Sequence, residues 1–217
     1  GIGWRALYAN TTGTQNTAIG TDSLKANTTG TGNTASGYRS LFTNTSASFN
    51  TAMGQVALAL NTTGASNTAF GYKSLEANTT GGQNVAVGDN ALGANTTADY
   101  NTAVGTSALL RNTTGTQNVS IGAFTLDTNT TGGGNVALGY QALRVNTTAS
   151  NNTGVGHKAL TANTTGGDNT ALGRDALGAN TTASNNTALG RMSLLSNTTG
   201  AGNTGVGLSA LRNNTTA

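Results

Sequence analysis

The sequence predicts an all-β protein, a parallel β-solenoid or β-roll of about thirteen 17-residue coils. Leucine recurs every seventeen residues from Leu7 to Leu211 without an insertion or deletion, and one glycine and two asparagines keep the same step. A strict period of this length is typical of solenoids, in which each repeat forms one coil and stacks on its neighbours. Glycine fills 32 positions, and the abundance of Gly, Thr and Asn disfavours helix.

The elements follow from the consensus Asn-Thr-Ala-Φ-Gly-x-x-Ala-Leu-x-x-Asn-Thr-Thr-Gly-x-x, in which Φ is aliphatic. Asn16–Ile19 is predicted to form a short strand, Gly20 a turn, and Ser23–Ala26 a second short strand. Asn27–Gly30 has turn chemistry, since Asn and Gly adopt positive φ readily. Coils of two strands and two turns stack at about 4.8 Å, which predicts a rod of roughly 60 Å.

Stacking converts each set of residues seventeen apart, here called a column, into a ladder along the solenoid. The leucine column of Leu24 is the expected core. Ala18 and Ile19 are neighbours in a strand and must face opposite sides, so one lines a narrow interior and the other a second surface that needs cover. Because so few large apolar residues support each coil, we expect a fibrous homotrimer, with a single-chain solenoid as the alternative.

The asparagine columns have two interpretations. Asn-Thr-Thr, or Asn-Thr-Ser at Asn44, is an N-glycosylation sequon and occurs thirteen times. Glycans on successive coils would lie only about 4.8 Å apart. A ladder of amide hydrogen bonds between coils is therefore favoured, and glycosylation of some sites is the alternative.

Charge and composition exclude several classes of partner. The net charge is +3 and the pI about 9.5, but the ten Lys and Arg residues are spread along the chain, so no nucleic acid is expected. Cysteine is absent, and no apolar run approaches the roughly 20 residues of a membrane span, so we expect no membrane insertion. Residues 1–217 begin and end inside repeats, and we expect a single repeat array, uncapped at both ends, within a longer protein.

No residue pattern predicts an enzyme, a cofactor or a metal site. His157 is the only histidine and occupies a variable column, so a solvated surface position is expected. The seven acidic residues are scattered, whereas general acid–base catalysis needs groups gathered at one cleft. Gly81-Gly82 and Gly132-Gly133-Gly134 lack the Lys-Ser/Thr of a phosphate loop.

Two sets of surface columns predict binding. Aromatic residues share one column, Tyr140 among them, and basic residues share the next. They form a candidate glycan-binding stripe of Trp4, Arg5, Tyr38, Arg39, Tyr72 and Lys73. The alternative is an exposed face with ordinary variation. The nearly unbroken Thr11 and Thr12 columns raise ice binding as a weaker hypothesis, although adjacent strand residues face opposite sides.

The motif Asn-Thr-Ala-Ile-Gly at Asn16–Gly20, with its variants at Asn84–Gly88 and Asn169–Gly173, resembles the head repeats of trimeric autotransporter adhesins. The resemblance implies trimeric, left-handed parallel β-rolls on bacterial surfaces. The Asn-Thr-Thr-Gly-x-x segment makes the repeat longer and more similar to the repeats of phage tail-fibre proteins. This second resemblance implies a virion fibre.

The expected function is thus structural: a shaft or head of an extracellular, cell-surface or virion fibre that displays an adhesive edge. Its expected partners are copies of itself, as a homotrimer or filament, with surface glycans as a further candidate. A self-assembling extracellular filament is the alternative function, and an ice-binding solenoid is a weaker one.

Overall fold

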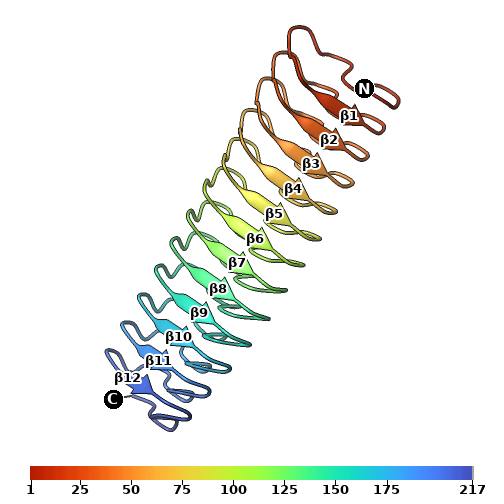
Figure 1. The fold of residues 1–217 in the computed structure, drawn as a ribbon. Helices are drawn as coiled ribbons and strands as arrows, with labels where there is room; N and C mark the ends of the chain where they lie inside the picture. Colours follow the sequence, from red (N-terminus) through yellow and green to blue (C-terminus); the bar gives the residue numbers. More distant parts are fainter. Residues whose placement is uncertain (217) are drawn as a thin grey trace. The chain divides into compact units, whose positions relative to one another are not determined.

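The computed structural model describes residues 1–216, which form short parallel β-strands and no helix. The chain divides into two compact units, unit 1 (Gly1–Ser107) and unit 2 (Ala108–Ala217). Unit 1 carries β1 (Thr17–Ile19), β2 (Thr34–Ser36), β3 (Thr51–Met53), β4 (Thr68–Phe70), β5 (Val85–Val87) and β6 (Thr102–Val104) (Figure 1). Unit 2 carries β7 (Val119–Ile121), β8 (Val136–Leu138), β9 (Thr153–Val155), β10 (Thr170–Leu172), β11 (Thr187–Leu189) and β12 (Thr204–Val206). One strand per 17-residue repeat confirms the predicted parallel β-solenoid.

Within each unit, consecutive strands pair in parallel with a register shift of one repeat. In unit 1, Thr17 pairs with Thr34 and Ala18 with Ala35. In unit 2, Thr170 pairs with Thr187 in the same way. Every sequence column is therefore a ladder of like residues in space, as the period predicts.

The interior of each unit is narrow and is lined by small residues and leucine. Ala18 is 1% exposed, whereas its neighbour Ile19 is 45% exposed, so the predicted division of the strand between two faces is confirmed. The leucine column is fully buried from Leu24 to Leu194. Since the aliphatic column of Ile19 lies outside, burial within each coil depends mainly on one leucine and two small side chains.

The predicted second strand at Ser23–Ala26 is wrong, because the backbone turns there. Asp22 and Leu24 have φ of 58° and 50°, in the left-handed region, and Gln15 forms a further left-handed corner with φ of 58°. The segment still bonds to the next coil, since Leu24 N–H donates to the Ser40 carbonyl at 2.9 Å. A left-handed L-residue costs about 1–2 kcal/mol, and the stacked neighbours must offset that cost at every coil.

The predicted turn at Gly20 is confirmed, and the position requires glycine. Its φ is 120°, and a Cβ added there would lie 2.7 Å from the carbonyl oxygen of Gly37 in the next coil. A side chain in this column would push the coils apart.

Two asparagine ladders run through the interior, and the predicted ladder is confirmed. Asn27 Nδ2 donates to Asn10 Oδ1 at 2.8 Å and to the Gly30 carbonyl at 3.0 Å. In the second ladder, Asn33 Nδ2 donates to the Ala47 carbonyl at 2.8 Å, and Asn33 N–H donates to Asn16 Oδ1 at 2.9 Å. The sequon asparagines from Asn27 to Asn197 are fully buried, so their amides have no room for a glycan.

The Thr-Thr-Gly corner directs several donors at one oxygen. The N–H groups of Thr11, Thr12 and Gly13 all donate to the Thr28 carbonyl, at 3.0, 3.1 and 3.2 Å. The Thr11 hydroxyl donates to the same oxygen at 2.9 Å. The corner thus explains why the segment recurs: it is a backbone nest that receives a carbonyl of the next coil.

Candidate binding surfaces

The described residues 1–216 contain no pocket within either unit and no group of three His, Asp or Glu side chains suited to a metal ion. No helix capable of crossing a membrane occurs among them. The candidate binding surfaces are the outer faces of the coils.

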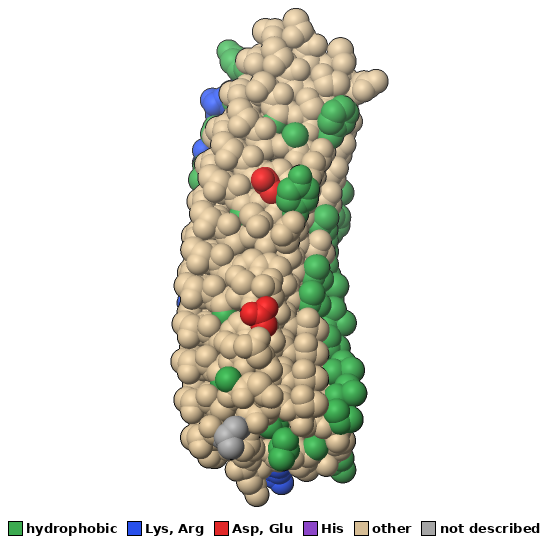
Figure 2. Space-filling view, turned by 90° about the vertical axis from the view of Figure 1, so that its left-hand side faces the viewer, with side chains coloured by type: hydrophobic (Ala, Val, Ile, Leu, Met, Phe, Trp, Pro, Cys, Tyr) green, Lys and Arg blue, Asp and Glu red, His purple; other side chains and the backbone are tan. Residues whose placement is uncertain are grey.

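The outer face of the strands carries a row of exposed and half-buried apolar side chains, here called the ridge. In unit 1 it comprises Ile2, Ile19, Met53, Phe70, Val87 and Val104, with Ser36 as the only polar member. In unit 2 it comprises Ile121, Leu138, Val155, Leu172, Leu189 and Val206. Figure 2 shows hydrophobic side chains gathered in a band along one edge, most densely in its lower part. A contiguous exposed apolar row is typical of an interaction surface.

A second row runs beside the ridge, since strand residues on either side of the buried alanine share a face. It consists mostly of threonine, with Thr170, Thr187 and Thr204 exposed on three successive strands of unit 2. Val85, Val119 and Val136 replace threonine in the same row. The sheet face thus pairs hydroxyl-bearing and aliphatic side chains.

The six residues of the predicted glycan-binding stripe all lie in unit 1, and their aromatic rings are exposed. Trp4 is 64% exposed, and Arg5 stacks over it with its Cζ 3.6 Å from the ring centre. Arg5 also forms a two-point ion pair with Asp22, at 2.7 and 2.9 Å. Lys73 lies 5.5 Å from the Tyr72 ring centre and 3.6 Å from the Glu76 carboxylate. These two cations therefore have acidic partners already.

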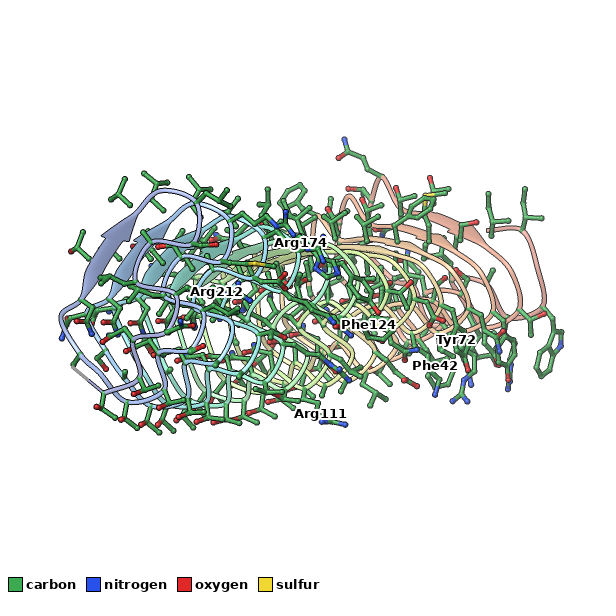
Figure 3. All side chains as sticks on the ribbon, turned by 90° about the horizontal axis from the view of Figure 1, so that it is seen from below. Phe42, Tyr72, Arg111, Phe124, Arg174 and Arg212 are labelled. Atoms are coloured by element: carbon green, nitrogen blue, oxygen red, sulfur yellow. The ribbon has the colours of Figure 1, made fainter. Side chains whose placement is uncertain are left out.

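Arg39 is arranged differently, and sequence reasoning missed its partner. Its guanidinium lies over the ring of Phe42 at 4.1 Å, rather than over Tyr38. Lys25, from the preceding coil, places its Nζ 5.1 Å from the same ring centre. Among residues 1–216, neither cation lies within ion-pair distance of a carboxylate. Figure 3 shows Phe42 and Tyr72 on the same side of the ribbon. The sequence did contain a signal for this contact, because Lys25 and Phe42 are seventeen residues apart and so stand in the same column.

In unit 2 residues of the aromatic column and of the column next to it form a small stack. Phe124 meets Tyr140 edge-on with ring centres 6.2 Å apart, and Tyr140 stacks on His157 at 5.7 Å. His157 is exposed, as predicted, and its Nδ1 lies 4.0 Å from Asp175. Asp175 also pairs with Arg174 at 3.1 Å. The stack lies on the surface of unit 2.

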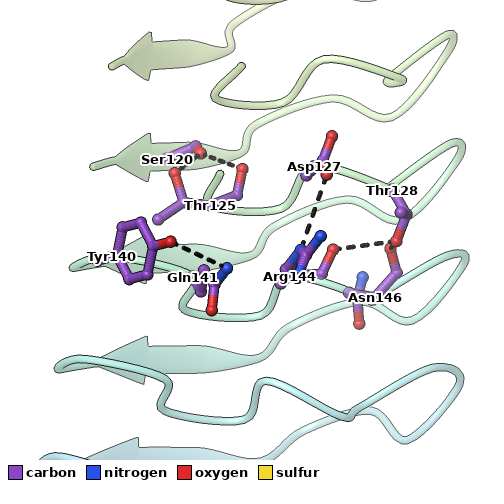
Figure 4. Close-up of polar contacts among 8 residues, drawn as sticks. All are labelled: Ser120, Thr125, Asp127, Thr128, Tyr140, Gln141, Arg144 and Asn146. Carbon is purple, nitrogen blue, oxygen red and sulfur yellow. Dashed lines mark hydrogen bonds and ion pairs between the residues drawn. The ribbon is translucent and has the colours of Figure 1, made fainter. Parts of the chain in front are cut away.

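In unit 2, two polar residues that contact each other replace two alanines of the core (Figure 4). Ser120 stands in the alanine column of the strand, and its hydroxyl contacts that of Thr125, itself in the column of Ala6. Ser120 Oγ is also 3.0 Å from the Thr125 carbonyl oxygen. Nearby, Arg144 lies 3.9 Å from Asp127 of the preceding coil. The Ser120–Thr125 contact is structural, because both side chains are buried.

The Thr11 and Thr12 columns do not form the double row that the ice-binding hypothesis needs. Hydroxyls of the Thr11 column are occupied, since Thr28 Oγ1 donates to the Thr45 carbonyl at 3.0 Å and Thr62 Oγ1 to the Thr79 carbonyl at 2.9 Å. Of these two columns, only that of Thr12 is exposed at every described coil.

No protein-family model, no curated protein and no solved structure matches the chain.

Proposed function

We propose that the chain is a structural shaft or head of an extracellular, cell-surface or virion fibre, with an adhesive edge and no enzymatic activity. The observation that carries the proposal is the exposed ridge on the sheet face of both units. A fold made of coil-to-coil ladders suits a mechanical role, because each coil is held by its neighbours through backbone and asparagine hydrogen bonds. The resemblance to adhesin heads and tail-fibre repeats supports the same role.

The occupant proposed for the ridge is the ridge of identical chains, arranged as a parallel homotrimer. Ridge side chains such as Ile121, Leu138 and Leu189 are 38–42% exposed. Full burial of such a side chain is worth about 1.5–3 kcal/mol, so covering the exposed part adds roughly 0.6–1.2 kcal/mol per coil. The six strands of one unit give roughly 4–7 kcal/mol for that unit of each chain, near the lower end of the ~4–15 kcal/mol cost of association. A short or crossed contact would be too weak, which favours alignment of the whole ridge.

Light scattering over a concentration series, with electron microscopy of the same samples, tests the proposal. We expect a constant trimer mass. Serine already occurs on the ridge at Ser36, so the fold tolerates it there. The double variant Leu172→Ser, Leu189→Ser should therefore fold but remain monomeric. Arg191→Ser, an exposed position next to the ridge in sequence, is the matched control. A stable monomer of the unaltered chain would refute the trimer, and a mass that grows with concentration would favour the filament.

Ice binding is a second candidate, and the two-row sheet face is the observation that favours it. Thr187 and Leu189 project from one strand to the same side, and like residues repeat at about 4.8 Å in β10 and β12. This function needs the face free, whereas trimer formation covers it. Thermal hysteresis that disappears in Thr187→Lys would support ice binding, and no hysteresis in the unaltered chain would exclude it.

A further inference from the structure

The geometry points to an anion subsite at Phe42 that would hold the acidic group of a polysaccharide laid along the coils of unit 1. The ligand class is a glycan with an acidic sugar alternating with an uncharged one. This inference rests on the proposed adhesive function and assigns a ligand chemistry to its edge. Phe42, Lys25 and Arg39 form the subsite, and Tyr38 lies in the same coil as Phe42.

The first argument is charge. Lys25 and Arg39 approach a single ring, at 5.1 and 4.1 Å from its centre, so two positive charges are held together on the surface. Within the described part of the chain, no carboxylate pairs with either of them. Two like charges repel, and a bound carboxylate or sulfate would relieve that repulsion while accepting charge-assisted hydrogen bonds. Cation–π contact with Phe42 orders both side chains in advance of binding.

The second argument is the spacing of exposed rings. Tyr38 is exposed, and Trp4 and Tyr72 stand in the same column two coils away on either side. Two coils correspond to about 10 Å at the strand spacing. This step is close to the length of two sugar units in an extended chain. Exposed aromatic faces bind the apolar faces of sugars, so the three rings would support every second sugar.

The third argument distinguishes this ligand from a uniformly charged polymer. At Trp4 the cation Arg5 is neutralised by Asp22, and at Tyr72 the cation Lys73 is neutralised by Glu76. The net positive charge is therefore concentrated at Phe42, with neutral positions on either side. A strand of nucleic acid carries a phosphate at every unit and is held by several Lys or Arg contacts. An alternating acidic and neutral glycan fits the observed charge pattern better.

Titration calorimetry on the full chain tests the proposal with four probes: an unsulfated glycosaminoglycan whose only acid is one uronate per disaccharide, its carboxyl-reduced form, neutral dextran and single-stranded DNA. We expect the uronate glycan to bind most tightly. Lys25→Gln with Arg39→Gln should weaken its binding at least tenfold and reduce the salt dependence by about two counterions. Lys158→Gln with Arg174→Gln in unit 2 removes the same charge and should change affinity less than twofold.

The charge-preserving double variant Lys25→Arg, Arg39→Lys should retain glycan binding. It is the control that separates the effect of charge at Phe42 from an effect of substitution on folding. Unchanged affinity in the Lys25→Gln, Arg39→Gln variant would overturn the proposal. Equal binding of the carboxyl-reduced glycan, or tighter binding of DNA, would overturn it as well. The native mass of the unaltered chain and of each variant is measured in parallel, because an unaltered chain that forms the trimer but does not bind the uronate glycan refutes the subsite alone. A monomer that still binds the glycan refutes only the trimer.

Discussion

Removing one amide from the buried ladder should destabilise the solenoid strongly, and Asn78→Ala is the clearest test. Asn78 Nδ2 donates to Asn61 Oδ1 and to the Gly81 carbonyl, both at 2.9 Å. Its Oδ1 accepts from Asn95 Nδ2 at 2.8 Å. The substitution therefore deletes three hydrogen bonds inside a fully buried column.

The magnitude follows from the partners that remain. Each lost hydrogen bond is worth about 1 kcal/mol, and a buried acceptor deprived of its donor costs a further ~1–3 kcal/mol. The Gly81 carbonyl keeps a second donor, Asn67 Nδ2 at 2.8 Å, and Asn95 Nδ2 keeps the Ala98 carbonyl at 3.1 Å. The deprived group is Asn61 Oδ1. We expect a loss of about 4–6 kcal/mol in the free energy of unfolding.

Urea unfolding followed by circular dichroism measures the loss, and Asn213→Ala, at an exposed position, is the control. Because coils interact with their nearest neighbours, side-chain amide exchange should accelerate first at Asn61 and Asn95. The double variant Asn61→Ala, Asn78→Ala should cost less than the sum of the single variants, since they share a bond. A loss below about 1 kcal/mol for Asn78→Ala would refute the ladder as a source of stability.

Three further predictions concern the interior. Gly71→Ala should lower the melting temperature far more than Gly64→Ala, because Gly71 has a φ of 134°, which residues with a side chain rarely adopt. A Cβ would meet a carbonyl oxygen of the next coil at both positions, but alanine already occupies the column of Gly64 elsewhere; equal melting temperatures would contradict this prediction. Ser120→Ala combined with Thr125→Ala restores the commonest residues of both columns and should leave urea stability within about 1 kcal/mol, whereas Ser120→Ala alone should cost more. Leu126→Ala, in the fully buried leucine column, should cost about 2–5 kcal/mol in the same assay, and a smaller loss would mean that the column collapses around the gap.

The period of the sequence was sufficient to predict what the stacking of like residues determines. The burial of Ala18 beside the exposed Ile19, and the amide bonds of Asn27, follow from strand alternation and identical spacing. The conformation of Leu24 did not follow, because leucine disfavours positive φ and only the closure of a narrow coil imposes it.

The binding surface was predicted only in part, for a different physical reason. Columns place Tyr38 and Arg39 side by side, but a long basic side chain selects its contacts through its rotamers rather than through the period. The guanidinium of Arg39 reaches Phe42, three residues further along the same coil, and meets Lys25 from the coil before. Such local choices depend on the variable residues at each coil, which no repeat pattern specifies.

The in-register ladders also make the coils interchangeable parts. Each coil presents asparagine, glycine and leucine to the coil before it, and the same residues to the coil after it. Adding or deleting one whole 17-residue unit within a ladder joins surfaces that already match, so the interior should accept it without a compensating change. A gene of this kind can therefore change the reach of its product in fixed steps by recombination between repeats, while single substitutions at the outer columns change what that length displays.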